Sequence, residues 1–485
     1  MKQNRVWSNV IYNIGYHILI LIVPFVTAPY VSRVLHPEGL GTYSVTTAIA
    51  KYFWMFGLLG MANYGNRRIA AVRDDTQRLS LEFTGLFCFQ LLTSLLSTAL
   101  FLGYTALFGF AHYGIVILCQ LPYLLSAVFE VSWFFSGTEQ FRFMVIKNSI
   151  IKLLTMGAVF LFVKTREHVW IYVLINTLSL LAGQLTLWPV LLKQIRFCKI
   201  SFAQVKQHLR PNLVLMVSVI AVSIYVMMDK IMIEWLSSRA QVGFYENTEK
   251  MLNMSTGIVG AIGTVMLPRM TYLMSNEQHG KSQLYLSKSL RYIMTFAIAV
   301  GCGIAGVGRE FAVVYFGPEY ALCGPAIAII SLALLFYSWE NILKTQYLLP
   351  HARDSVYVKG TVAAAVCNLV LNFLFIPRLG AIGAVIGTVG AQAAAAVYES
   401  LRIRKELPLG RYLKDLAPVA GMGALMFGLC RWIGAGLGCA PFTLLVQVAA
   451  GGLLFLVLCG LYYGYKKDEL FMKLWQKIRS RTGGR

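Results

Sequence analysis

The sequence predicts an all-α polytopic membrane protein with about fourteen transmembrane helices, because each apolar segment reaches the roughly 20 residues that cross a bilayer. Hydrophobic residues make up 57% of the chain and charged residues only 13%, against roughly 25% charged in a soluble domain. Short loops join the apolar segments, and Lys and Arg collect in every second loop. The composition therefore indicates the class of protein, and the loop charges indicate its orientation.

The apolar segments define the predicted spans. The ninth and thirteenth are short, and the eighth is unusually polar. The spans are residues 9–31, 40–62, 81–102, 113–135, 145–163, 169–192, 213–235, 251–270, 292–308, 321–343, 356–376, 381–398, 417–433 and 442–465.

The net charge of +22 comes largely from loops on one predicted side of the membrane. Positive loops face the cytoplasm, so both termini are predicted to be cytoplasmic. We therefore expect anionic membrane lipids, not nucleic acid, as partners of these loops. The basic clusters include Arg67, Arg68, Arg73 and Arg78; Lys193, Arg196, Lys199, Lys206 and Arg210; Arg402, Arg404, Lys405, Arg411 and Lys414; and the tail from Lys466 to Arg485.

Two halves of the chain look related. A Gly-x-Tyr pattern follows the first span at Gly41 and Tyr43, and it recurs after the seventh at Gly243 and Tyr245. Six helices followed by six more predict two parallel lobes around a central cleft, the architecture of alternating-access transporters, with two C-terminal helices added. The predicted parts are a six-helix lobe at 1–192, a basic cytoplasmic linker at 193–212, a six-helix lobe at 213–400, and two extra helices with a basic cytoplasmic tail at 401–485.

Four motifs occur in the order expected of one family. They are PYVSRVLHPEGLGTYS after the first span, WFFSGTEQFRFMVIKNSIIK from Trp133 to Lys152, DKIMIEWLSSRAQVGFYE from Asp229 to Glu246, and LLPHARDSVYVKGTVAAAVCNLVLNFLFIPRLGAIGAVIGT from Leu348 to Thr388. With them the chain resembles the polysaccharide-unit flippases of the multidrug/oligosaccharidyl-lipid/polysaccharide exporter superfamily. The resemblance covers the chain from Asn9 to about Tyr398, and the last two spans are weakly patterned.

The resemblance implies a flippase of the bacterial plasma membrane. Such a protein moves undecaprenyl-diphosphate-linked oligosaccharide units from the inner to the outer leaflet for O-antigen, capsule or exopolysaccharide assembly. A polysaccharide polymerase and chain-length machinery are possible partners. A multidrug-type small-molecule or cation antiporter and a peptidoglycan lipid-precursor flippase share this fold, so both remain alternatives.

An enzyme is the rival class. Membrane glycosyltransferases and polymerases usually carry a large outer domain with acidic residues, whereas the outer loops here are short and poor in paired carboxylates. The nine cysteines show no metal-ligand spacing. We therefore expect neither an enzyme nor a metal site, and no cofactor.

An ATP site is not expected. The stretch from His279 to Ser282 resembles the end of a phosphate-binding loop, but Ser275 stands where that motif needs glycine, and no strand precedes it. The energy for transport would then come from an ion gradient, the membrane potential or downstream consumption of the product.

The substrate head group requires cations inside the membrane, because hydrocarbon strongly penalises a diphosphate. Lys51 lies near the middle of the second span, and Lys250 is its approximate repeat counterpart at the start of the eighth. Charges at such depth are rare and functional by default. We predict that both lysines bind the diphosphate. Alternatively, Lys51 pairs with a buried carboxylate and Lys250 with Glu246, one turn earlier.

Three further residues are substrate-binding candidates. Arg33, just outside the first span, could meet the phosphate, although a snorkelling interfacial arginine fits equally. Asn368 and Asn372 lie one turn apart in the eleventh span. They are candidates for contacts with sugar hydroxyls, and a bond between helices is the favoured alternative.

Coupling or gating candidates lie in several spans. Lys230 and Glu234 are spaced to pair with each other, which leaves Asp229 in need of a cation or a proton. Glu130, near the inner end of the fourth span, has the same two interpretations, with a structural role favoured. Pro24 and Pro29 each remove a backbone hydrogen bond in the first span and favour a kink that could open the cleft.

Basic residues also crowd two repeat-equivalent positions on the predicted inner side. They could collect an anionic substrate before it enters the cleft, and the positive-inside rule explains them equally well. These inner-entrance candidates are Arg142, Lys147 and Lys152 before the fifth span, and Lys344, Arg353 and Lys359 between the tenth and eleventh.

Overall fold

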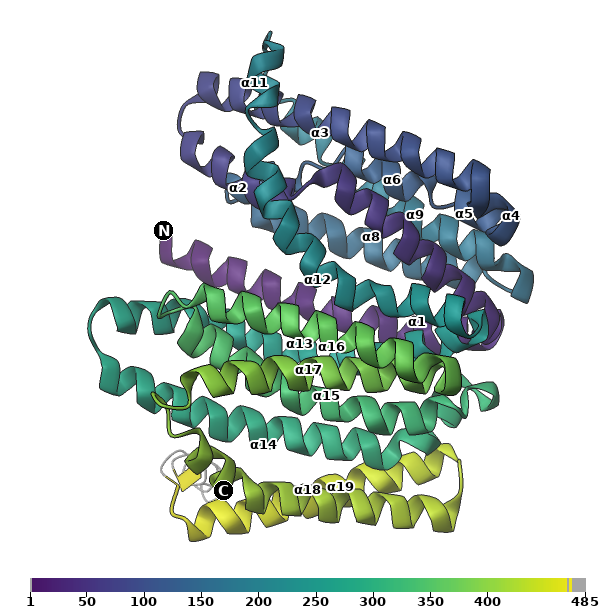
Figure 1. Cartoon of the computed structure of the whole chain (residues 1–485), viewed down its shortest axis with the longest axis vertical. Helices are drawn as coiled ribbons and strands as arrows, with labels where there is room; N and C mark the ends of the chain where they lie inside the picture. The colour runs from purple at the N-terminus through teal and green to yellow at the C-terminus, as the bar shows by residue number, and fades with distance from the viewer. Residues whose placement is uncertain (1, 469–470, 473–485) are drawn as a thin grey trace. The chain divides into compact units, whose positions relative to one another are not determined.

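The computed structural model describes the backbone of residues 2–468 and 471–472, and the side chains from residue 22 onward except 141, 214–222 and 224–226. Throughout these residues the regular elements are helices, and no strand occurs among them (Figure 1). The chain forms two compact units. Unit 1 contains Met1–Glu246 and Ile376–Ala381, and unit 2 contains Asn247–Phe375 and Ile382–Arg485.

The helices up to the end of α12 and the start of α13 lie within unit 1, and the rest of α13 belongs to unit 2. A short π-helical segment, η1, and a 3-10 turn, η2, interrupt the α-helices. The elements are α1 Lys2–Leu58, α2 Met61–Val72, α3 Thr76–Tyr104, η1 Thr105–Gly109, α4 Phe110–Tyr113, α5 Ile115–Leu118, α6 Leu121–Val128, α7 Ser132–Gly137, α8 Phe141–Phe162, η2 Arg166–His168, α9 Val169–Leu185, α10 Trp188–Leu191, α11 Phe202–Lys206, α12 Leu209–Leu236 and α13 Arg239–Ser275.

The remaining elements belong mostly to unit 2. There α14 packs against α15, α18 and α19, and α18 packs against α19. The elements are α14 His279–Phe311, η3 Ala312–Phe316, η4 Pro318–Tyr320, α15 Cys323–Leu343, η5 Lys344–Leu348, α16 Asp354–Leu379, α17 Ala381–Ile403, α18 Leu409–Leu437 and α19 Pro441–Tyr465.

The predicted number of membrane helices is confirmed. Twelve stretches of the described chain are long and apolar enough to cross a membrane. One of them, Ile22–Val72, contains two crossings that are joined at a bend, and α12 adds a further 28-residue helix. Together they make about fourteen, so the chain is an all-α multi-pass membrane protein.

Many helices are longer than the predicted spans, because an α-helix continues into polar flanks wherever its backbone bonds are satisfied. The ninth span, predicted at 292–308, lies in the C-terminal part of α14, His279–Phe311. The fourth differs in kind: the single span predicted at 113–135 is broken into α5, α6 and α7. The break before α5 is at Gly114, whose φ is +58°.

A bend in α1 lies beside its third proline, and the gating role of Pro24 and Pro29 stays a prediction. The one non-helical residue inside α1 is His36, with φ +58° and ψ 172°. Pro24 and Pro29 lie within the helical stretch before it, and Pro37 begins the stretch after it. Proline is well tolerated at the first position of a helix, so the chain turns where the first span ends.

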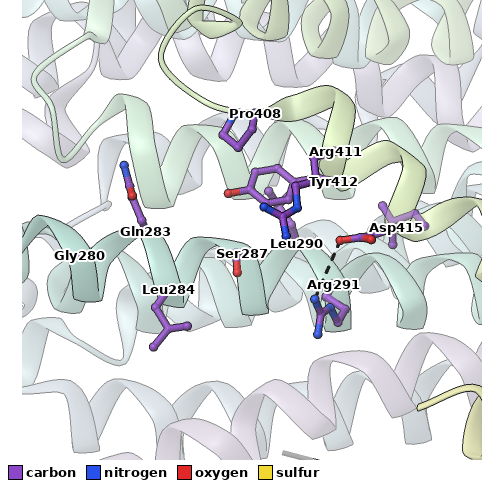
Figure 2. Close-up of a pocket in the computed structure, with 11 residues that line it drawn as sticks. Gly280, Gln283, Leu284, Ser287, Leu290, Arg291, Pro408, Arg411, Tyr412 and Asp415 are labelled. Carbon is purple, nitrogen blue, oxygen red and sulfur yellow. Dashed lines mark ion pairs between the residues drawn. The ribbon is translucent and has the colours of Figure 1, made fainter. Parts of the chain in front are cut away.

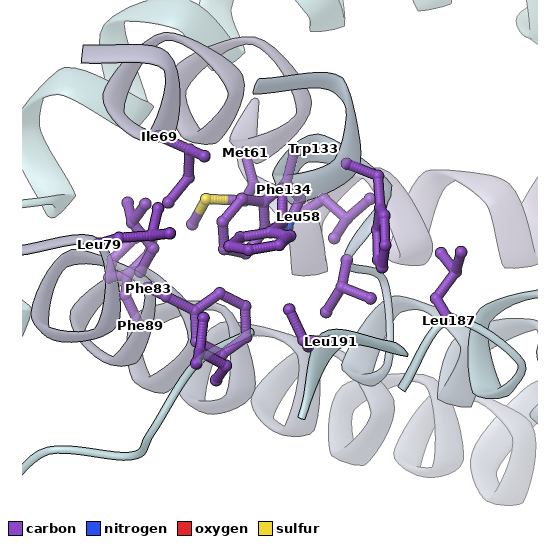
Figure 3. Close-up of a cluster of buried hydrophobic side chains, with 14 of the residues drawn as sticks. Leu58, Met61, Ile69, Leu79, Phe83, Phe89, Trp133, Phe134, Leu187 and Leu191 are labelled. Carbon is purple, nitrogen blue, oxygen red and sulfur yellow. The ribbon is translucent and has the colours of Figure 1, made fainter. Parts of the chain in front are cut away.

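A buried aromatic cluster forms the core of unit 1 near α2, α3 and α7 (Figure 3). Trp133 and Phe134 from α7 lie against Phe83 from α3, with ring centroids 5.4 and 5.6 Å apart. A Cβ at Gly65 of α2 would lie 2.8 Å from the Trp133 ring, so α2 packs directly on the indole. Residues of this WFFSG motif therefore build the core.

The basic linker joins the same core. Ile195 and Val205 are buried in it, and Ile200 packs against it. At the end of the linker His208 is only 1% exposed, and its Nδ1 lies 3.1 Å from the Tyr64 hydroxyl. The linker is thus part of the packed unit.

We expect His208 to make stability depend on pH. Burial lowers the pKa of His208 below its usual 6.5, Glu82 raises it and Arg68 lowers it. Below pH 6.5 the unfolded state then binds more protons than the folded state, so the free energy of unfolding falls as the pH drops from 6.5 to the lowered value. Thermal melting of the purified protein should show this loss, and His208→Gln should reduce it.

The exposed His279 is the matched control, because its imidazole is solvated in both states. His279→Gln should leave the pH dependence as in the wild type. An equal slope for His208→Gln and the wild type would contradict the prediction.

Candidate functional site

Two repeat-equivalent glycines meet at the predicted outer end of unit 1. A Cβ at Gly41 would lie 1.9 Å from the carbonyl oxygen of Arg239, and a Cβ at Gly243 would lie 2.0 Å from that of Pro37. Because both distances are far below van der Waals contact, only glycine permits this crossing of α1 and α13. The predicted Gly-x-Tyr repeat therefore supplies a reciprocal backbone contact.

The next repeat-equivalent pair is hydrogen-bonded. Ser44 Oγ donates to Glu246 Oε2 over 2.6 Å, and these residues are 202 positions apart, the same offset as the two glycines. Glu246 also forms an ion pair with Lys230 Nζ at 2.7 Å. One residue earlier on each of these two helices, the Tyr245 hydroxyl donates to Asp229 Oδ2 over 2.5 Å. We call Ser44, Asp229, Lys230, Tyr245 and Glu246 the outer cluster.

The outer cluster changes the expected pairing on α12. Lys230 and Glu234 were expected to pair with each other, but Lys230 pairs with Glu246 instead. Glu234 binds Arg239 Nε at 2.9 Å and lies 3.2 Å from His112 Nε2. The i,i+4 spacing on one helix is overridden because α13 and the α4 region bring closer partners.

The two predicted diphosphate ligands lie in different units. Lys51 is partly buried in the second crossing of α1, where the neighbouring Tyr52 hydroxyl donates to the Ser223 carbonyl over 3.3 Å. Lys250 is partly buried in α13, with its Nζ 3.3 Å from Asn247 Oδ1. The joint role of the two lysines stays a prediction.

Asn368 and Asn372 are fully buried in α16. The Asn372 amide donates to Asn368 Oδ1 over 3.2 Å, and a Cβ at Gly387 of α17 would lie 2.1 Å from Asn372 Oδ1. This hydrogen bond lies within α16, so contacts of the two amides with sugar hydroxyls or with a neighbouring helix stay a prediction. Arg33 is exposed beside the α1 bend.

Glu130 links the short helices of the broken fourth span by hydrogen bonds. It lies between α6 and α7, accepts hydrogen bonds from the Ser132 amide at 2.9 Å and from the Ser132 hydroxyl, and accepts a third from Gln184 of α9. A carboxylate that accepts the first amide bond of a helix is a structural cap. The contacts agree with the structural interpretation favoured for this residue.

The inner-entrance residues fall into two groups. Lys344 pairs with Glu340 at 3.2 Å, Arg353 pairs with Glu406 at 2.6 Å, and Lys147 donates to the Gly183 carbonyl over 2.5 Å. Arg142 and Lys359 are exposed, and Lys152 is partly buried. Partners within the protein therefore hold at least Lys147, Lys344 and Arg353 in place.

A polar cavity of about 370 Å3 lies between the first turns of α14 and α18 (Figure 2). Arg291 and Asp415 face each other across it at 4.0 Å, with Arg411 and Tyr412 beside them. Gly280, from the phosphate-loop-like stretch, also lines it, but a helix, α13, precedes that stretch where a phosphate-binding loop needs a strand. Among the described residues no group of three or more His, Cys, Asp or Glu is arranged to hold a metal.

Several buried polar groups were missed by the sequence reasoning. Glu310 is 1% exposed and lies 3.5 Å from Arg431 Nη1, with Gln447 Nε2 3.2 Å away. Glu340 and Glu399 are buried in α15 and α17. A signal was available for Glu340, because carboxylates inside apolar spans are rare, whereas Glu310 and Glu399 lie just beyond the predicted spans.

Comparison with known proteins places the chain in a family. Residues 6–274 match the model of the family described as "Polysaccharide biosynthesis protein", and residues 238–435 match the model described as "Lipid II flippase MurJ". A Shigella dysenteriae protein described as "Putative O-antigen transporter" is 22% identical over 80% of this chain and 96% of its own length. An Escherichia coli protein with the same description is 24% identical over 80% and 92%.

A solved structure shares the fold. The lipid II flippase MurJ in an inward closed conformation superposes with a TM-score of 0.75 and 15% identity, covering 95% of this chain and all of that one. At that identity the likeness concerns the fold alone. Since the first family model matches more than half of the sequence, from the first span into α13, this multi-pass membrane protein belongs to the polysaccharide biosynthesis protein family.

Proposed function

We propose that this protein is a flippase that moves lipid-linked oligosaccharide units across the membrane. The observation that carries the proposal is the match, over nearly their full length, to relatives described as O-antigen transporters. The MurJ-like fold supports it. The finer proposal is that the carrier is undecaprenyl diphosphate, moved from the inner to the outer leaflet of a bacterial plasma membrane for surface polysaccharide, with both termini cytoplasmic.

Lys51 is the proposed centre of head-group binding. It lies near the middle of a membrane-crossing helix, where an ammonium group is costly unless it has an anionic partner. The ammonium group of Lys51 would attract a diphosphate while the polyprenyl tail stays in lipid. Lys250 is the second proposed ligand, and Arg33 would meet the phosphate near the predicted outer end.

We assign the gating role to the outer cluster. Its ion pair and hydrogen bonds join α1, α12 and the start of α13, so release toward the outer leaflet would require them to break. Asp229 and Lys230 belong to this cluster, and Glu234 with Arg239 extends it. The exposed Arg142 and Lys359 would attract the anionic head group on the inner side.

Lipid-linked intermediates in the native host test the function. Deleting the gene should cause undecaprenyl-diphosphate oligosaccharides to accumulate, as measured by mass spectrometry of lipid extracts. The wild-type gene should reverse the accumulation and Lys51→Ala should not, because the variant has lost the cation near mid-membrane. Lys281→Ala is the matched control, since that lysine is exposed in the first turn of α14 and has no part in the proposed binding site.

Two other outcomes would contradict the proposal. Normal intermediates together with new sensitivity to cationic drugs would favour a small-molecule antiporter of the same fold. Accumulation of the peptidoglycan precursor, with loss of growth, would favour the peptidoglycan lipid-precursor flippase.

A further inference from the structure

Unit 2 contains a buried carboxyl group that nothing in the described protein satisfies. The side chain of Glu399 in α17 is fully buried, and neither of its oxygens has a hydrogen-bond partner among the described residues. None of the ion pairs found in that part of the chain includes it. A Cβ at Gly360 of α16 would lie 3.3 Å from Glu399 Oε1, so the carboxyl group lies against the backbone of a neighbouring helix.

A second carboxyl group lies near the same lysine as Glu399. Glu340 of α15 is 6% exposed and forms an ion pair with Lys344 at 3.2 Å. Glu399 lies in the electrostatic field of both residues. Trp339 Nε1 donates to Ser400 Oγ over 2.8 Å, and this bond holds the two glutamate-bearing helices together.

The other ionisable groups nearby form contacts of their own. Tyr357 of α16 lies under Lys344, whose Nζ is 5.2 Å from the ring centroid, and Tyr337 of α15 lies in the field of Lys344. On α17 itself, Arg402 lies over the Tyr398 ring at 5.0 Å. One ammonium group therefore faces two carboxyl groups.

An ionised Glu399 would be costly here. A buried carboxylate without hydrogen bonds or a cation of its own loses its hydration without compensation. Two carboxyl groups that share one cation do not both ionise readily. The protonation state with the lowest cost is therefore the one in which Glu340 is ionised, Lys344 is charged and Glu399 carries a proton.

We propose that Glu340, Lys344 and Glu399 form a binding site for one exchangeable proton, held on Glu399 in this conformation. To release it, the O–H bond of the Glu399 carboxyl group breaks, the proton passes to water, and the Lys344 ammonium group compensates the new carboxylate. The π-helical segment η5 begins at Lys344, and such segments often mark functional sites because they reposition side chains. The side chain of Lys344 is 20% exposed, so the proton could leave the site at the end of the helices where the basic residues lie.

The site would couple transport to a proton gradient, and this part rests on the flippase function proposed above. In the conformation described here the proton is bound. A movement that admits water to Glu399, or shifts Lys344 toward it, would release the proton. As the protein alternates between these states, the proton gradient would supply the energy for transport without ATP.

Infrared spectroscopy of the purified protein in lipid nanodiscs tests the proton directly. In difference spectra at pH 7, which cancel the lipid ester bands and the bands of the other carboxyl groups, the wild type should show a carboxylic-acid C=O band that Glu399→Gln removes. Glu340→Gln should also remove it, because Lys344 is then free to pair with Glu399. Glu406→Gln should keep the band, since Glu406 is already paired with Arg353 on the surface. A band that persists in Glu399→Gln or Glu340→Gln would overturn the proposal.

The role of this site in transport is tested by measuring the same lipid-linked intermediates in the native host. Gln has nearly the shape of protonated Glu, so Glu399→Gln should keep the wild-type melting temperature yet accumulate intermediates like the deletion strain. Glu399→Asp should retain activity and Glu406→Gln should behave as wild type. Normal flipping by Glu399→Gln would overturn the coupling role alone. If the wild-type gene itself fails to reverse the accumulation, the flippase function fails, and the infrared result still decides the proton site.

Discussion

Alanine in place of Gly41 or Gly243 is expected to destabilise the protein strongly. Each new Cβ would meet a backbone carbonyl oxygen at 1.9–2.0 Å, and a backbone atom cannot rotate away as a side chain does. Overpacking usually lowers the free energy of unfolding by about 1–3 kcal/mol. Because the backbone neighbour is rigid, we expect a loss at the upper end of this range or larger. The melting temperature in detergent should fall for both variants, and flipping should be impaired.

Gly157→Ala is the matched control for these variants. Nothing lies within 4 Å of the Cβ position at Gly157 in α8, and alanine is the better helix former. The control should therefore be neutral or slightly stabilising. Wild-type melting and wild-type flipping in both Gly41→Ala and Gly243→Ala would show that α1 and α13 do not cross this closely.

Trp133→Ala is expected to have the largest effect on stability. The indole is 1% exposed, stacks on Phe83, and donates through Nε1 to Gln90 Oε1 at 2.9 Å and to the Glu130 carbonyl at 3.0 Å. Removing a buried Trp leaves a cavity and costs roughly 3–5 kcal/mol. Chemical denaturation followed by circular dichroism should show this loss.

Two further variants separate the causes. Trp133→Phe keeps most of the volume but leaves the Gln90 acceptor with one donor fewer, so about 1–3 kcal/mol should be lost. Trp235 is 78% exposed on α12, and Trp235→Ala should change little. A loss for Trp235→Ala as large as for Trp133→Ala would mean that burial in this cluster is not the cause.

Predictions that rest on composition and repetition agree with the structure. Fourteen apolar segments become membrane helices because every backbone polar group in lipid must bond within its own segment. The four ordered motifs led to the same family that the comparison identifies. The Gly-x-Tyr repeat was visible as a pattern, and the structure adds that its two glycines touch.

The spacing of residues along the sequence did not predict which side chains pair between helices. Lys230 and Glu234 have the spacing of a helical pair, but α13 offers Glu246 at 2.7 Å. Glu399 looked like an ordinary residue near the end of a span. Its importance appears only once α15 and α16 enclose it without giving it a partner. Helical spacing describes neighbours along one helix and says nothing about the helix alongside.

The sequence by itself determined the class of this protein, its number of membrane helices, its predicted orientation and its family, because these depend on local hydrophobicity, loop charge and ordered motifs. Only the tertiary structure decided where α1 bends, which glycines touch, which cations already have a partner and which carboxyl group is left without one. Those outcomes depend on contacts between residues such as Ser44 and Glu246, 202 positions apart, whose distance in space is set by the packing of whole helices.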